Sequence, residues 1–183
     1  MAGEFSYLST DANDMSAASF AYYSCGAAGL AYKTCKAKNL DLASQDSEPL
    51  LRYMDSLIGD HYPDPDSRPL PIKADGKQIF RWLEEGDPVV ERIYTEFISS
   101  LRQVIHNIQI TVGPDLIALG GGLNLNPRLL PDLQQSLDRY YQETKLDPVL
   151  QASIVRCHYQ SEGNVLGAMA NFLATHPEMN EAT

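Results

Sequence analysis

Apolar residues recur at helical spacing along this 183-residue chain, and the pattern is clearest over residues 88–111. Apolar side chains return there every three or four positions, which places them on one face of a long helix. Asp87 can cap the helix with its carboxylate, and Pro88 suits the first helical position. Gly113 and Pro114 then end it. We expect this apolar face to form core rather than a ligand site.

Weaker patterns predict further elements on both sides of this helix. Helices are predicted over residues 16–38, 48–58, 77–85, 127–144 and 165–174, and strands over residues 5–8 and 149–155. Gly26 and Gly29 weaken the first helix but allow a close approach to a neighbouring element. Prolines crowd residues 59–75 and disfavour helix and central strand, so we expect a surface loop within one domain there.

The most informative segment joins a short apolar run, residues 116–119, to Gly120, Gly121 and Gly122. The run has strand length, and the glycines let backbone N–H groups approach a ligand closely. Asn126 followed by proline predicts a helix start. A helix N-terminus behind a glycine turn suits phosphate or another anion. The alternative is a tight strand-to-helix turn that binds nothing.

A second glycine turn, residues 161–164, follows the strand predicted over residues 149–155. The order helix, strand, glycine turn, helix, strand, turn and helix predicts an α/β layer with parallel strands. Ligands of such sheets bind at the carboxyl edge of the strands. Gly163 and Asn164 would lie at that edge together with the first glycine turn, which predicts a nucleotide cleft.

Net charge, hydrophobic runs and cysteine content argue against several classes of function. The net charge of -10 argues against nucleic-acid surfaces and anionic membranes, and no apolar run approaches the length of a membrane span. The N-terminus does not resemble a secretory signal, and three widely spaced cysteines indicate reduced thiols in a cytoplasmic protein. No Ser/His/Asp triad can be argued. Among the histidines, His158 alone precedes a glycine turn.

These features together resemble the ROK family (repressors, open reading frames and sugar kinases). Residues 115–127 resemble its second nucleotide-binding motif, and residues 86–88 with the long helix resemble the stretch before that motif. Residues 163–168 resemble the closing glycine turn and last helix. The segment Gly3-Glu4-Phe5 resembles the family's segment whose glutamate contacts the sugar.

The resemblance implies the α/β fold of actin-like ATPases (ribonuclease H-like), as the C-terminal half of a sugar kinase. It implies ATP-dependent phosphorylation of a hexose hydroxyl, with Mg²⁺ bridging phosphate oxygens. Glu4 and Tyr7 would face the sugar. The implied ATP-binding positions are Gly120, Gly121, Gly122, Asn126, Gly163 and Asn164.

The chain also departs from the family pattern. Tyr7 stands where the family has a sugar-binding, zinc-linked histidine, and the Cys-rich zinc motif is absent, so we expect no structural zinc. The second sugar glutamate has no acidic match among residues 16–24. The Asp-x-Gly-Gly-Thr phosphate loop and the catalytic aspartate segment do not occur. No catalytic residue is therefore assigned, and we expect negligible kinase turnover from this chain alone.

Residues 1–183 are thus interpreted as one domain, similar to the C-terminal part of ROK proteins, without the N-terminal ROK domain. The predicted function is the nucleotide- and sugar-binding part of an ATP-dependent hexose kinase. Its predicted partners are a hexose and either a second copy or the missing N-terminal half. One alternative is a non-catalytic sugar-sensing or dimerisation module of a ROK-type regulator. Another is a different α/β nucleotide-binding protein that shares only the glycine turns.

Overall fold

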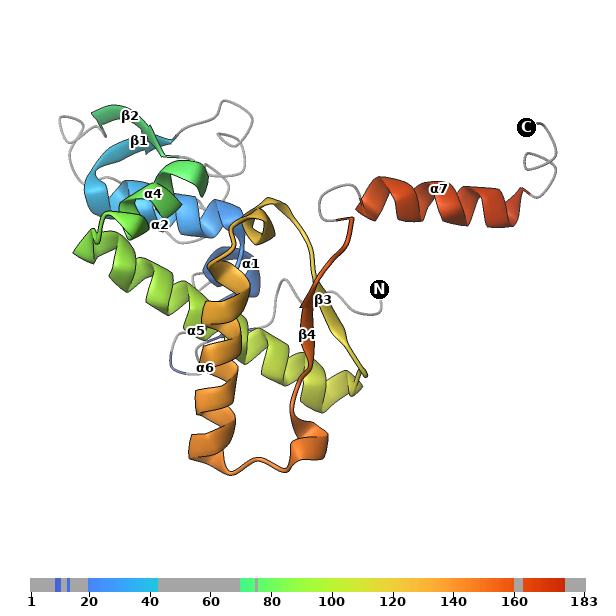
Figure 1. The fold of residues 1–183 in the computed structure, drawn as a ribbon. Helices are drawn as coiled ribbons and strands as arrows, with labels where there is room; N and C mark the ends of the chain where they lie inside the picture. Colours follow the sequence, from blue (N-terminus) through green and yellow to red (C-terminus); the bar gives the residue numbers. More distant parts are fainter. Residues whose placement is uncertain are drawn as a thin grey trace.

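A computed structural model describes residues 9–10, 13, 20–42, 70–74, 76–159 and 163–176 (Figure 1). Its helices and strands are α1 (Ala21–Ser24), α2 (Ala27–Lys38), β1 (Leu40–Leu42), β2 (Leu70–Ala74), α4 (Gly76–Glu84), α5 (Pro88–Val112), β3 (Ile117–Leu119), α6 (Leu129–Thr144), β4 (Ile154–Arg156) and α7 (Gly163–Thr175). The described residues also include two 3-10 helices, η2 (Gly122–Leu125) and η3 (Pro148–Leu150). Helices dominate, so the predicted α/β class holds only in part.

Helix α5 runs through the middle of the molecule and confirms the longest predicted helix (Figure 1). The Asp87 carboxylate accepts hydrogen bonds from the N–H groups of Val89 and Val90, at 3.0 and 3.1 Å. Gly113 ends the helix with a φ of 63°, which glycine adopts readily. Local capping and apolar spacing therefore suffice to set both ends of this element.

The core lies where α4, α5 and α6 meet. Its fully buried members include Ile79 from α4, Val90 from α5, and Leu133 and Leu137 from α6. Burying each such side chain contributes about 1.5–3 kcal/mol relative to leaving it exposed. The Tyr141 hydroxyl accepts a hydrogen bond of 3.0 Å from the N–H of Ala152, which joins α6 to the segment before β4. The core thus holds the second half of the described fold together.

Two small parallel sheets accompany the helices. In one, β3 pairs with β4 so that Ile117 lies opposite Ile154 and Leu119 opposite Arg156. This confirms the parallel strands predicted around the glycine turn. Because side chains alternate along a strand, Ile154 is buried on one face and Val155 is 37% exposed on the other. The parallel register also brings the carboxyl ends of β3 and β4 to the same edge.

The second sheet corrects the prediction of a loop over residues 59–75. Residues 70–74 form β2, which pairs in parallel with β1, while residues 43–69 lie outside the described part. Among the described residues this sheet has two strands, so each has an open edge there, and proline is tolerated at an edge because no ladder hydrogen bond needs its missing N–H. Pro71 is therefore compatible with this strand.

Helix boundaries differ from the predictions in the N-terminal part. The helix predicted over residues 16–38 is divided into α1 and α2 at Cys25 and Gly26. A Cβ at Gly29 would lie 1.7 Å from the backbone oxygen of Tyr23, so the expected close approach is confirmed at Gly29. The helix predicted over residues 48–58 and the strand over residues 5–8 lie outside the described residues.

Two boundaries near the C-terminus also differ. The strand predicted over residues 149–155 is replaced by η3 and the shorter β4. Helix α7 begins at Gly163, so Gly163 and Asn164 belong to its first turn instead of a preceding turn. Figure 1 shows α7 extending away from the rest of the molecule. No helix in the described ranges is both long and apolar enough to cross a membrane.

Candidate functional site

The three glycines lie directly after β3, at the carboxyl edge of the parallel pair. Gly121 has a φ of 87°, a conformation that side chains disfavour, so the turn itself requires glycine there. Gly122 has no such requirement. A Cβ at Gly121 or Gly122 would meet no atom within 4 Å, so open space borders both residues.

Two hollows flank this turn, and Gly122 lines both of them. The smaller has a volume of about 230 Å³ and is lined by Cys25, Ala27, Phe97, Leu101, Leu119, Gly120, Gly121, Gly122, Leu123, Asn124 and Leu129. The larger measures about 510 Å³, within the range typical of small-molecule sites. Its lining is Ala27, Gly76, Lys77, Phe80, Gly122, Leu123, Leu125, Asn126 and Pro127. Gly122 of the glycine turn therefore lies between the two hollows and lines each of them.

The larger hollow combines apolar walls with one positive charge. Phe80 and Leu125 provide apolar surface, and Lys77 lies in the first turn of α4. Lys77 is exposed, so its ammonium group can meet an anion without losing all its water. Such a lining suits a ligand with a flat apolar end and a negatively charged end.

Asn124 stabilises the conformation of the glycine turn through hydrogen bonds to its backbone. Its backbone N–H donates to the Gly121 oxygen at 3.2 Å, and its side-chain Nδ2 donates to the Gly120 oxygen. The side chain is buried, at 6% exposure, and its Oδ1 has no hydrogen-bond partner in the described part of the chain. A buried acceptor without a partner costs about 1–3 kcal/mol. A ligand donor at Oδ1 would remove that cost.

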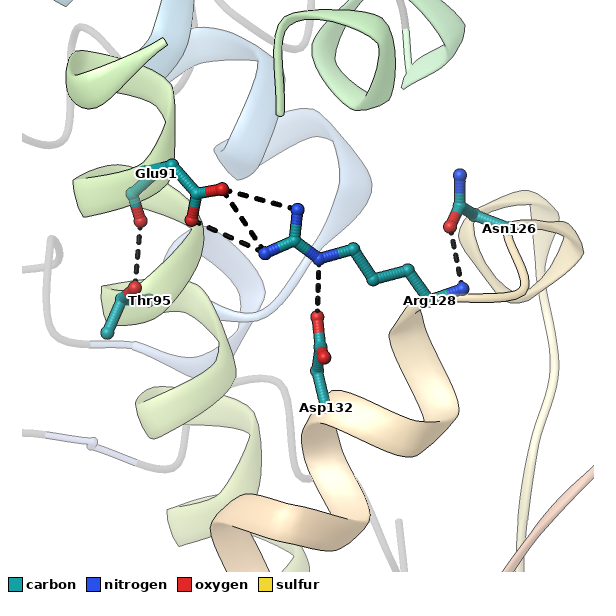
Figure 2. A network of polar contacts seen from close by, with 5 residues as sticks. All are labelled: Glu91, Thr95, Asn126, Arg128 and Asp132. Atoms are coloured by element: carbon teal, nitrogen blue, oxygen red, sulfur yellow. Dashed lines mark hydrogen bonds and ion pairs between the residues drawn. The ribbon is translucent and has the colours of Figure 1, made fainter. Parts of the chain in front are cut away.

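The structure corrects the helix start that was predicted at Asn126. Helix α6 begins at Leu129, and Asn126 instead caps the end of η2, the 3-10 helix that begins at Gly122. Its Oδ1 accepts a hydrogen bond of 2.9 Å from the N–H of Arg128, as Figure 2 shows. Asn126 therefore turns the chain toward α6, and it also lines the larger hollow.

Arg128 fixes the end of this loop between two helices (Figure 2). Its Nε donates to Asp132 of α6 at 2.8 Å, and its terminal nitrogens donate to Glu91 of α5 at 3.3–3.4 Å. Its guanidinium carbon lies 5.2 Å from the centre of the Tyr94 ring. These contacts attach the start of α6 to the first turn of α5, and so position the segment that carries Asn126.

Cys25 borders the smaller hollow without the reactivity of an activated thiol. Burial raises the pKa of Cys25 to about 11, although Ser24 and Lys33 oppose this shift. The thiol is therefore protonated at neutral pH and is a poor nucleophile. In the described ranges, no group of three or more His, Cys, Asp or Glu side chains is placed to hold a metal ion.

For the other predicted site residues, the structure describes the backbone of some and leaves others outside the described ranges. The backbone of Gly163 and Asn164 begins α7, beyond the carboxyl end of β4. Because β3 and β4 run in parallel, both glycine segments leave the sheet from the same edge. His158 follows β4 and packs edge-on against Tyr159. The predicted sugar-binding residues Glu4 and Tyr7 lie outside the described residues.

Sequence reasoning missed several residues that border the turn or position it. They are Cys25, Lys77, Phe80, Asn124 and Arg128. Asn124 could have been suspected from its place two residues after the glycines. Lys77 and Arg128 carry no local signal, because their roles depend on segments that come together only in the fold.

The family model of the ROK family matches residues 64–175. This chain belongs to the ROK family. The match includes α4 to α7 and the glycine turn, so it confirms the family that the motifs predicted.

Two beta-glucoside kinases are among the curated relatives. The protein from Listeria monocytogenes is 25% identical over 98 residues, which cover 54% of this chain and 31% of the kinase. The protein from Klebsiella pneumoniae is 29% identical over 97 residues, which cover 53% and 30%. The aligned segment thus spans about a third of the length of these kinases.

Solved structures of the family share the fold. A ROK family protein from Streptococcus pneumoniae, in complex with sucrose, has a TM-score of 0.66 at 19% identity, covering 96% of this chain and 50% of that chain. A candidate N-acetylmannosamine kinase from Listeria monocytogenes has a TM-score of 0.62 at 19% identity, covering 96% and 48%. The chain therefore spans about half the length of these relatives.

Proposed function

We propose that this chain is the ATP-binding part of a ROK-family sugar kinase, with an actin-like ATPase fold. We further propose that the Gly120–Gly122 turn forms a wall of the nucleotide site. The observation that carries this proposal is the open space beside Gly121 and Gly122, bordered by two cavities. Two of the relatives are beta-glucoside kinases, which supports the choice of ATP.

The lining residues suggest how ATP would lie. The adenosine end suits the larger hollow, where Phe80 and Leu125 offer apolar surface. Lys77 would attract the phosphates, and the glycines would let the backbone come close to them. The unpartnered Oδ1 of Asn124 would accept a hydrogen bond from a ligand hydroxyl or amino group. Gly163 and Asn164, at the start of α7, would complete the nucleotide site.

The proposed substrate is a hexose or a hexose-containing sugar, with Glu4 and Tyr7 as the sugar contacts. Phosphoryl transfer needs positioned phosphates, Mg²⁺ and a base for the sugar hydroxyl. This sequence contains no Asp-x-Gly-Gly-Thr loop and no assigned base. We therefore propose that residues 1–183 bind nucleotide but, taken alone, give negligible kinase turnover.

Calorimetric titration of the purified chain with ATP and Mg²⁺ tests the proposal. Gly122→Val adds a side chain where the protein itself offers no clash, so it should weaken ATP binding at least about tenfold, about 1.4 kcal/mol, without unfolding the chain. Gly167→Val in α7 is the matched control, because a Cβ there also meets nothing. Its ATP affinity should equal that of the unmodified chain.

Three results would contradict the proposal. The first is no heat of binding for the unmodified chain, and the second is equal ATP affinity for the Gly122→Val variant. The third is binding of glucose without binding of ATP, which would favour the sugar-sensing module instead.

A further inference from the structure

A further hollow lies between α5 and α6, separate from the glycine turn. It has a volume of about 350 Å³ and shares no lining residue with the two hollows beside Gly122. Residues of α5, among them Tyr94 and Arg102, form one wall, and residues of α6 together with Arg128 form the other. The volume is sufficient for a small organic ligand.

Positive charge gathers in this hollow, although the chain as a whole has a net charge of -10. Arg102, Arg128 and Arg139 line it, and Asp132 is the one carboxylate among its lining residues. The charge of Arg128 is compensated, because its guanidinium group donates to Asp132 and to Glu91 (Figure 2). The ion pairs among the described residues do not include Arg102 or Arg139. Two uncompensated guanidinium groups therefore border the hollow.

Neighbouring side chains hold Arg102 in a fixed orientation. Its guanidinium carbon lies 4.9 Å from the centre of the Tyr140 ring, and its Nη2 donates to the Ser99 hydroxyl at 3.3 Å. Its Nε is buried and has no acceptor in the described part of the chain. A guanidinium group that is already oriented loses less conformational freedom when it binds an anion. Arg102 is therefore prepared to donate into the hollow.

Tyr94 adds a buried donor to the same hollow. The residue is 2% exposed, and its hydroxyl makes no hydrogen bond of standard geometry with any described residue. Burial raises the pKa of Tyr94, and the charge of Asp132 raises it further, so the hydroxyl stays protonated at neutral pH. A buried donor without an acceptor is unfavourable. An anionic oxygen in the hollow would supply the missing acceptor.

We propose that the hollow between α5 and α6 binds a phosphate group, with Arg102 and Arg139 compensating its charge and Tyr94 donating a hydrogen bond. Arginine binds phosphate strongly because its planar group can donate two parallel hydrogen bonds. Phosphate suits this hollow better than a carboxylate does, because its additional oxygens can meet donors from both helices. The volume also leaves room for a small molecule that carries the phosphate. This site is independent of the proposed nucleotide site.

Calorimetric titration of the purified chain, in a buffer free of phosphate, tests the site. The probes are inorganic phosphate and glycerol 3-phosphate, with glycerol as the uncharged control. We expect saturable binding of the phosphate group and none of glycerol. Tighter binding of glycerol 3-phosphate would identify the ligand as a phosphorylated small molecule, whereas equal affinities would identify it as free phosphate.

Two pairs of variants locate the phosphate. Arg139→Gln should weaken phosphate binding at least about fivefold, because it removes one of the two uncompensated charges. Its control is Arg81→Gln, an exposed arginine of α4 outside the hollow, which should leave the affinity unchanged. Tyr94→Phe should weaken binding at least about threefold without lowering the denaturation midpoint, since its hydroxyl has no partner to lose. Tyr141→Phe breaks the hydrogen bond to Ala152, so it should lower the midpoint and leave the affinity unchanged.

Four outcomes would overturn the inference. The first is that neither phosphate nor glycerol 3-phosphate binds, and the second is unchanged affinity of the Arg139→Gln or the Tyr94→Phe variant. The third is equal weakening by Arg81→Gln, which would attribute binding to the overall charge. The fourth is loss of phosphate binding in the Gly122→Val variant, which would assign the phosphate to the glycine turn. ATP titration tests the nucleotide site separately, so the two failures are distinguishable.

Discussion

Helices α5 and α7 are both rich in apolar residues, yet one is covered by the fold and the other is not. Apolar residues of α5 such as Val90 and Ile105 are almost completely buried between other helices. In α7, Val165 and Phe172 remain in solvent, and the helix has no charged residue to make that exposure favourable. The difference divides the described part of the molecule into a packed region, built from α1, α2, α4, α5 and α6, and a projecting region, α7.

The largest expected difference between the two regions concerns glycines. Gly29→Ala puts a Cβ 1.7 Å from the Tyr23 oxygen, so α1 and α2 must separate. We expect a loss of about 3 kcal/mol or more in the free energy of unfolding. Gly167→Ala in α7 meets no atom and should leave that free energy unchanged or raise it by at most about 1 kcal/mol. Urea denaturation measures the free energy of unfolding of both variants. Equal losses would contradict the difference between the packed region and α7.

Truncating a leucine in each region tests the same difference between the packed helices and α7. Leu137→Ala in α6 removes a side chain with no exposed surface and should cost about 2–5 kcal/mol through the cavity that it leaves. Leu166→Ala in α7 removes a side chain that is 37% exposed and should cost less than about 1 kcal/mol. The two denaturation midpoints should therefore differ clearly. A large cost at Leu166 would show that α7 packs in the isolated chain.

Arg128 should matter more than an ordinary surface arginine. Arg128→Met removes the contacts to Glu91 and Asp132, and solvent screening of these part-exposed groups limits the loss to about 1 kcal/mol. The control is Arg92→Met, whose pair with Glu96 is more exposed and should contribute less than about 0.5 kcal/mol. Thermal unfolding compares the two variants. Equal effects would contradict a positioning role for Arg128.

The smallest expected effect depends on pH. Burial and the neighbouring charge of Arg102 lower the pKa of His106, which packs against Tyr140. The unfolded chain therefore binds the proton more readily, and the stability that neutral His106 contributes above its unfolded pKa of about 6.5 is lost as the pH falls below it. His106→Gln should flatten the decrease in stability below that pH. An unchanged pH profile would exclude His106 as the source.

The sequence predicts best what depends on neighbouring residues. The boundaries of α5 follow from Asp87, Pro88 and Gly113, which act within one turn of the helix ends. The strand before the glycines follows from its apolar run. Asn126 was misassigned because a 3-10 turn, η2, begins at Gly122 and precedes α6, a detail that no local rule signals.

The other site residues could not be predicted from the sequence because they depend on long-range contacts. Arg128 and Glu91 are 37 residues apart, and their pairing exists only because α5 and α6 lie side by side. Lys77 of α4 likewise lines the larger hollow beside Gly122 only because of how the helices pack. The sequence identified the three glycines as the centre of a candidate site, but the residues around them depend on how the helices pack.

We propose that the glycine turn binds nucleotide. Nuclear magnetic resonance spectra of the labelled chain, recorded during titration with ATP and Mg²⁺, test it most directly. We expect saturable shifts of the backbone amide signals of Gly121, Gly122 and Asn124, with no comparable shift at Lys145 at the far end of α6. Unchanged signals at the three loop positions, at ATP concentrations that saturate sugar kinases, would contradict it.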